Sequence, residues 1–180
     1  YIPTSEERTI LRAFEGWGPL AKAFDPRPEG KWLTVADDLD DLLDEPALAH
    51  ARDQVDTSFF TPRVVSDALY RVLAATGFTG GSIVELGCGA GHVMADAPDT
   101  WDVSWTGVEI DPTSARIAAL LNPDAKVHTG RLEATALADG QADAVVGNVP
   151  FSGATIRDAA HEYTGNLHGY FVHRAMLALR

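Results

Sequence analysis

The segment Glu85-Leu86-Gly87-Cys88-Gly89-Ala90-Gly91 is the strongest indication of fold class in the sequence, because it joins an apolar run to the start of a helical pattern. The run that leads into it, residues 82–86, is rich in apolar and β-branched residues and predicts a strand, and residues 90–97 predict a helix. Glycines let the chain turn sharply, and they bring main-chain N–H groups at a helix start close to a ligand. The segment therefore predicts a ligand-binding turn at the end of a strand.

The alternation of strand and helix continues on both sides of this turn. Further strands are predicted at 105–110, 126–128 and 144–146, and further helices at 62–76, 112–121 and 166–179. This order predicts an α/β fold, a Rossmann-like parallel sheet whose ligands bind beyond the carboxyl ends of the strands. About four strands are predicted in this sheet.

Residues 1–56 differ from the rest and are interpreted as an N-terminal helical extension, with the α/β domain at residues 57–180. Thr4 and Glu7 have the spacing of a capping box and predict a helix that ends before Gly16. Glycines and prolines then predict a packed loop with a short helix as far as Gly30. Spaced leucines in an Asp-rich run predict a solvated helical stretch over 35–51, with a break near Pro46.

Composition narrows the class of protein. The 180 residues include 46% hydrophobic residues, enough for a core, and carry 14 basic and 26 acidic side chains, a net charge of −12. That charge repels phosphates, so the chain alone is expected to bind nucleic acid poorly. Cys88, the single cysteine, leaves no internal disulfide or cysteine-based zinc site, and no metal is expected. Without a long apolar run or a signal-like start, we expect a cytoplasmic protein with no membrane contact.

A carboxylate after the second strand is the next candidate binding group. Glu109 stands 18 residues after Gly91, close to the offset of about 20 at which an acidic side chain accepts hydrogen bonds from ribose hydroxyls. The turn itself does not have the dinucleotide spacing, because His92 occupies the place of the third glycine, and no phosphate-loop lysine follows. Asp111 is interpreted as the N-cap of the helix that begins at Pro112.

The residues Gly147-Asn148-Val149-Pro150-Phe151 follow the fourth predicted strand. They place an amide, a carbonyl held at a proline turn and an aromatic ring in succession at a strand's carboxyl end. Such a set can hold a flat group that carries an amine. It therefore predicts a substrate site beside the glycine turn.

In this order the motifs resemble those of the class I S-adenosylmethionine-dependent methyltransferases, and among them the amino-group DNA methyltransferases that modify adenine. The resemblance covers the cofactor-contacting segment Ser58-Phe59-Phe60-Thr61-Pro62, the first motif Glu85–Gly91, the second motif Gly107-Val108-Glu109-Ile110-Asp111 and the catalytic motif Asn148-Val149-Pro150-Phe151. Gly16-Trp17-Gly18 and Leu167-His168-Gly169-Tyr170-Phe171 also resemble the methyltransferase module that precedes a helicase in phage and mobile-element proteins.

The resemblance implies S-adenosylmethionine as cofactor and the exocyclic amino group of adenine in DNA as methyl acceptor. The implied cofactor-binding residues are Phe59, Phe60, Thr61, Pro62, Glu85, Gly87, Cys88, Gly89, Gly91, Glu109, Ile110, Arg131, Leu132, Glu133 and Asn148. The implied catalytic residues are Asn148, Val149, Pro150 and Phe151. The Asn148 side chain and a main-chain carbonyl would accept the amino hydrogens, and Phe151 would stack on a base flipped out of the duplex. Domains of this family usually have more than four strands, so the resemblance also implies that the domain is truncated at its C-terminal side. Implied partners are DNA, contacted through regions absent from this chain, and a helicase domain in the same polypeptide.

Two departures from the family pattern leave alternatives open. Val149 replaces the first proline of the catalytic motif, where only the main-chain carbonyl is needed. Arg131 stands where the family has an acidic residue that accepts from the cofactor's adenine, so either Glu133 substitutes or that contact is lost. The acceptor is alternatively a protein glutamine or an RNA amino group, or the chain is a non-catalytic module that keeps the cofactor as a structural element. The chain alone is expected to bind cofactor weakly and to methylate DNA poorly or not at all.

Overall fold

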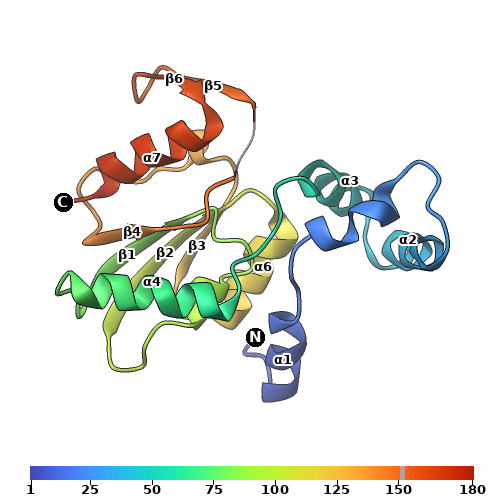
Figure 1. The fold of residues 1–180 in the computed structure, drawn as a ribbon, viewed down its shortest axis with the longest axis horizontal. Coiled ribbons are helices and arrows are strands. Elements are labelled where there is room, and N and C mark those ends of the chain that lie inside the picture. Colours follow the sequence, from blue (N-terminus) through green and yellow to red (C-terminus); the bar gives the residue numbers. More distant parts are fainter. Residues whose placement is uncertain (151–152) are drawn as a thin grey trace.

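A four-stranded parallel sheet forms the centre of the molecule (Figure 1). The structure, a computed structural model, describes residues 1–150 and 153–180. The strands are β1 (Gly80–Leu86), β2 (Asp102–Glu109), β3 (Lys126–Thr129) and β4 (Ala144–Val146), in the order β3-β2-β1-β4. The four strands predicted from the sequence are confirmed, as is the Rossmann-like α/β class. In this order β1 is central and its carboxyl end, the glycine turn, lies between the ends of β2 and β4.

Helices cover both faces of the sheet. The helix α4 (Arg63–Ala75) lies on one face and α7 (Leu167–Ala178) on the other, as Figure 1 shows. The helices α5 (His92–Ala95) and α6 (Pro112–Leu121) pack with α4. The bounds of α4, α6 and α7 agree with the predicted helices to within one residue, and α5 is two residues shorter at each end than its predicted range of 90–97.

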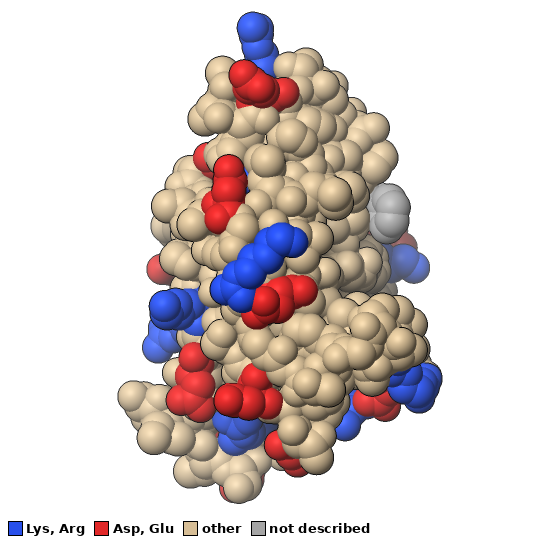
Figure 2. Space-filling model, turned by 90° about the vertical axis from the view of Figure 1, so that its left-hand side faces the viewer, with Lys and Arg blue, Asp and Glu red and all other residues tan. Residues whose placement is uncertain are grey.

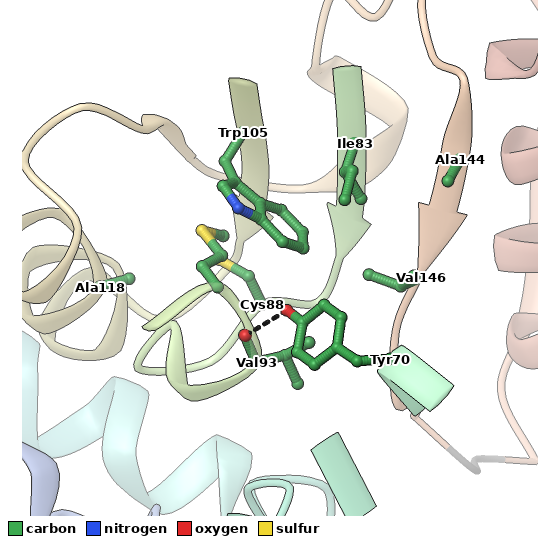
Figure 3. Close-up of a cluster of buried hydrophobic side chains, with 9 residues drawn as sticks. Tyr70, Ile83, Cys88, Val93, Trp105, Ala118, Ala144 and Val146 are labelled. Carbon is green, nitrogen blue, oxygen red and sulfur yellow. Dashed lines mark hydrogen bonds between the residues drawn. The ribbon is translucent and has the colours of Figure 1, made fainter. Parts of the chain in front are cut away.

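The face covered by α4 carries the core shown in Figure 3. Ile83 is completely buried there, and Tyr70 donates a hydrogen bond from its hydroxyl to the carbonyl of Val93 (Figure 3). The side chain of Cys88, from the glycine turn itself, is part of this cluster. Burial of each large apolar side chain contributes roughly 1.5–3 kcal/mol. The glycine turn is thus anchored, through Cys88, in the same apolar cluster that packs the sheet against its helices.

The opposite face is covered partly by a hairpin that the sequence did not predict. Its strands are β5 (Thr155–Asp158) and β6 (Tyr163–Asn166), which pair antiparallel. Asp158 accepts a hydrogen bond from the Tyr170 hydroxyl at 2.5 Å, and Arg174, 2% exposed, donates to the Tyr170 oxygen and to the carbonyl of Leu132. Because Leu132 belongs to the short helix η2 (Leu132–Ala134), this network ties the hairpin and α7 to the loop after β3.

The N-terminal region is helical, as expected. It comprises α1 (Ser5–Arg12), η1 (Gly18–Phe24), α2 (Lys31–Leu42) and α3 (Glu45–Gln54). The capping box of Thr4 and Glu7 is confirmed, and so is the break predicted near Pro46, because α2 ends at Leu42 and α3 begins at Glu45. Arg8 donates to the carbonyl of Leu121 at the end of α6, so α1 lies against the sheet-covering layer. None of the helices in the described residues is both long enough and apolar enough to span a membrane.

Candidate cofactor site

A cavity of about 300 Å³ opens at the carboxyl ends of β1, β2 and β4. The predicted residues that line it are Phe59, Phe60, Thr61, Glu85, Gly87, Cys88, Gly89, Glu109, Ile110, Arg131, Leu132, Glu133, Asn148 and Pro150. Pro62, Gly91 and Val149 do not contribute to the lining, and Phe151 lies outside the described residues. The four separate motifs therefore meet at one cavity, as the positions of three of them at strand ends predict.

The glycine turn forms the floor of this cavity. Gly89 has φ +53°, and a Cβ on it would come within 2.6 Å of the Phe60 ring, so the residue must lack a side chain. Gly91 has φ +72° and serves packing instead, because a Cβ there would lie 2.6 Å from the amide nitrogen of Asn122 on α6's C-terminal side. Gly89 thus allows the close approach of the Phe60 ring at the cavity, and Gly91 allows the close packing of the turn against the C-terminal end of α6.

Glu109 points into the cavity beside this turn. Its Oε2 accepts the main-chain N–H of Gly89 at 2.8 Å, and its Oε1 accepts that of Asp111 at 2.9 Å. Burial raises the pKa of Glu109 and the charge of Asp111 adds to the rise, while these N–H donors oppose it. A carboxylate offers about four acceptor positions, so each oxygen can still accept a hydrogen bond from a ligand hydroxyl. The geometry is that expected for a group that binds a ribose.

Glu85 supplies a second, more deeply buried carboxyl group. It is 2% exposed, and its Oε2 has no hydrogen-bond partner within the described residues. Burial, and next the nearby charge of Glu109, raise the pKa of Glu85 well above its ordinary value of 4.5. An unpartnered buried carboxyl oxygen beside a cavity is a site for a cationic or hydrogen-donating ligand group.

Replacing Glu85 with glutamine is expected to raise the melting temperature at neutral pH. Because the pKa of Glu85 is raised in the folded state, the unfolded chain loses its proton first, and stability falls as the pH rises above 4.5. The Glu85→Gln variant lacks this loss. Thermal unfolding of both proteins between pH 4 and pH 8 should show curves that meet at the acidic end and separate by several degrees at the neutral end. A constant difference across this range would contradict the assigned pKa.

The turn after β4 brings the predicted catalytic residues to the same cavity. Gly147 passes so close to β1 that a Cβ on it would lie 2.7 Å from the carbonyl oxygen of Leu86. Asn148 follows directly, is exposed, and lines the cavity together with Pro150. A Cβ on Gly87 would lie 4.0 Å from the Pro150 ring. The main chains of the glycine turn and of the Asn148 turn are therefore adjacent.

The loop after β3 closes the cavity on another side. The guanidinium of Arg131 donates to Glu133 at 3.0 Å, and both residues line the cavity with the buried Leu132 between them. Glu133 is thus placed where it can accept from a ligand, as the sequence analysis requires if it substitutes for the missing acidic residue. Arg131 partly neutralises it, because the two side chains form an ion pair.

Several lining residues were not predicted as site residues. They come from the C-terminal part of α3 and the residues after it, from the hairpin and the residue before it, from α5 and from α7: Asp53, Gln54, Thr57, Ala154, Ile156, His92, Leu167 and Phe171. Burial lowers the pKa of His92, which begins α5. Nothing in the spacing of the α3 residues distinguishes them from a solvated helix, so only the tertiary arrangement reveals that the N-terminal region forms a wall of the site.

Comparisons with known proteins agree with this arrangement. Residues 83–168, from β1 to the start of α7, match the family described as Methyltransferase domain. Two solved structures align with a TM-score of 0.55. One is a proposed class I S-adenosylmethionine-dependent methyltransferase from Listeria monocytogenes, with 17% identity over 94% of this chain and 52% of that chain. The other is a proposed RNA methyltransferase from Pyrococcus horikoshii, with 15% identity over 98% of this chain and 70% of that chain. The search of curated proteins returned no significant match.

A proposed S-adenosylmethionine-dependent methyltransferase from Methanococcus maripaludis aligns at a TM-score of 0.46 and 16% identity, over 83% of this chain and 58% of that chain. The chain thus spans 58% and 52% of the length of the Methanococcus and Listeria proteins. It has the class I S-adenosylmethionine-dependent methyltransferase fold, and S-adenosylmethionine is the cofactor of that fold.

The residues of the cavity fit this cofactor. S-adenosylmethionine carries a sulfonium and an ammonium group, which suit the unpartnered buried oxygen of Glu85, and two ribose hydroxyls, which suit Glu109. The cavity volume of about 300 Å³ lies at the lower end of the usual range for small-molecule sites, about 300–1,000 Å³.

Proposed function

We propose that this chain transfers a methyl group from S-adenosylmethionine to an exocyclic amino group, that of adenine in DNA. The observation that carries the proposal is the position of Asn148 and Pro150 on the wall of the cavity that also contains Glu109 and the glycine turn. An acceptor held at Asn148 would lie at the mouth of the cofactor site. This proximity is what methyl transfer requires, because donor and acceptor must be held in line.

The chemistry asks little of the protein beyond positioning. The cofactor, when bound, supplies an activated methyl group. The Asn148 Oδ1 and the Val149 carbonyl would accept the two hydrogens of the amino group and turn its lone pair toward the methyl carbon. A nitrogen–carbon bond forms as the carbon–sulfur bond breaks, and the amino group then releases one proton to water. Glu109 and Glu85 fix the donor, and no strong base is required.

Two segments, taken together, favour adenine in DNA as the methyl acceptor. The Ser58–Pro62 segment and the Asn148–Phe151 turn resemble those of amino-group DNA methyltransferases, and the structure brings Phe59, Phe60 and Asn148 to one cavity. The acceptor base would have to leave the duplex to reach it.

Charge indicates where DNA would be held. On the face shown in Figure 2, basic side chains are scattered and acidic ones lie among them, without a continuous basic patch. With a net charge of −12, this chain gains little from phosphate contacts. We therefore place most DNA binding, and any coupled helicase, in other polypeptide segments.

Transfer of labelled methyl groups tests the acceptor. We expect label from S-adenosylmethionine to enter adenine-containing single-stranded DNA at low salt, slowly, and not the same oligonucleotide with every adenine replaced. RNA and a glutamine-bearing protein substrate serve as the competing acceptors. Label on either of these alone would redirect the proposal to that acceptor, and S-adenosylhomocysteine binding without transfer to any substrate would favour a non-catalytic module.

A further inference from the structure

The turn Gly16-Trp17-Gly18 is packed between two segments of the cofactor site. Trp17 is 3% exposed. A Cβ on Gly16, which has φ +94°, would lie 2.4 Å from the carbonyl oxygen of Ser58, and a Cβ on Gly18 would lie 2.4 Å from the Phe59 ring. A glycine is therefore required at position 16 by its contact with the main chain of the segment that lines the cavity, and Gly18 lies directly against the Phe59 side chain.

Hydrogen bonds join this turn to the segment. The main-chain N–H of Trp17 donates to the Ser58 hydroxyl at 3.0 Å, and the N–H of Gly18 donates to the Ser58 carbonyl at 2.9 Å. Ser58 is itself 9% exposed and lines the cavity, as do Phe59 and Phe60 directly after it. The position of both rings thus depends on the turn.

A second link runs from the indole to the ribose-binding carboxylate. The Trp17 Nε1 donates to the Asp111 Oδ2 at 2.9 Å in a buried contact. The main-chain N–H of Asp111 in turn donates to the Glu109 Oε1 at 2.9 Å. Trp17 is therefore connected to Glu109 through Asp111, although Trp17 precedes both residues by more than 90 positions in the sequence.

Helix capping does not account for this contact. The Asp111 Oδ2 already accepts the N–H of Ser114 at 2.9 Å and the Ser114 hydroxyl at 2.5 Å, which completes the N-cap of α6. The indole is an additional donor from a distant segment. Its removal leaves the cap intact, so its effect can be separated from helix stability.

We infer that the Gly16-Trp17-Gly18 turn is a positioning element of the cofactor site, which fixes Glu109 through Asp111 and the Phe59–Phe60 segment through Ser58. The inference rests on the proposed use of the cavity for S-adenosylmethionine, but not on the acceptor. It makes the N-terminal region a functional part of the site. Binding of the adenosine moiety should then depend on a tryptophan that does not line the cavity.

The test compares Trp17→Phe with the unchanged chain. Phenylalanine keeps an aromatic ring against Phe14, whose centroid lies 4.9 Å from that of Trp17, and removes the N–H donor together with part of the buried indole volume. Calorimetry should show S-adenosylhomocysteine binding about 5–10-fold more weakly to this variant, the loss expected for one buried hydrogen bond. The matched control is Trp32→Phe on α2, whose ring contacts Lys31 outside the cavity and whose replacement should leave the affinity unchanged.

A ligand analogue separates positioning from a general loss of structure. S-adenosylhomocysteine without its ribose 2′-hydroxyl lacks a contact to Glu109, so Trp17→Phe should weaken its binding much less than that of the complete ligand. Equal losses for both ligands, or no loss for either, would overturn the inference. If the variant does not fold, hydrogen exchange measured on the unchanged chain tests the inference instead. The ligand should slow exchange of the Trp17 and Gly18 amides, and an unchanged rate would refute the link between the turn and the cofactor site.

Ligand binding without methyl transfer would refute only the proposed acceptor chemistry.

Discussion

Replacing Asn148 with alanine is expected to reduce methyl transfer by about 10²–10³-fold, the usual cost of deleting one well-placed hydrogen-bonding group that acts in the transition state. Asn148 is exposed at the cavity wall and is separated from β4 only by Gly147. Its side chain stabilises no described helix or strand, so the fold should persist. Steady-state transfer of labelled methyl groups measures the effect, in the full-length protein if the chain alone is too slow.

The matched variant is Asn148→Asp, which retains an oxygen that can accept an amino hydrogen. We expect it to recover part of the activity. S-adenosylhomocysteine binding should change less than threefold in Asn148→Ala, because the catalytic contact is to the acceptor. Full activity in the alanine variant would move catalysis away from this turn.

Replacing Glu109 with alanine is expected to weaken S-adenosylhomocysteine binding by about 100-fold or more. Each hydrogen bond from a ligand hydroxyl to a charged carboxylate contributes about 1.5–3 kcal/mol, and two of them exceed the roughly 2.8 kcal/mol that corresponds to a factor of 100. The variant also removes the acceptor for the Gly89 and Asp111 N–H groups, which loosens the glycine turn. Calorimetry measures the loss directly.

Glu29→Ala is the control for this experiment, since Glu29 is exposed in the loop before α2. Its affinity and melting temperature should match those of the unchanged chain. The raised pKa of Glu109 adds a second signature: binding to the unchanged chain should weaken as the pH falls through that pKa, because a protonated carboxyl accepts hydrogen bonds less well. Equal binding by Glu109→Ala would remove the ribose assignment.

The sheet could be predicted because its signals are local. The runs around Ile83 and Val145 are apolar and β-branched, and Asp111 followed by Pro112 marks the start of α6, which begins where predicted. The motif spacing then placed Glu85, Glu109 and Asn148 at strand ends, and parallel topology brought them together.

The features that escaped prediction depend on tertiary contacts. The strands β5 and β6 have four residues each and a polar composition, and they are held by the buried Tyr170 and Arg174 of a later helix. The contribution of Gln54 to the cavity and the bond from Trp17 to Asp111 likewise require residues far apart in sequence to meet. Hydrophobic periodicity carries no information on contacts between distant residues, so the N-terminal wall of the site can be recognised only in the three-dimensional structure.

The contact of Gly147 with the Leu86 carbonyl has an evolutionary consequence. The contact is between main-chain atoms of neighbouring strand ends. The distance between the methyl donor and the methyl acceptor is therefore set by the spacing of the strands, and side-chain replacements should not change it. Relatives that modify other molecules should therefore keep this spacing and diverge in the outer walls. Exchanging those walls between homologues is the rational route to a new acceptor preference.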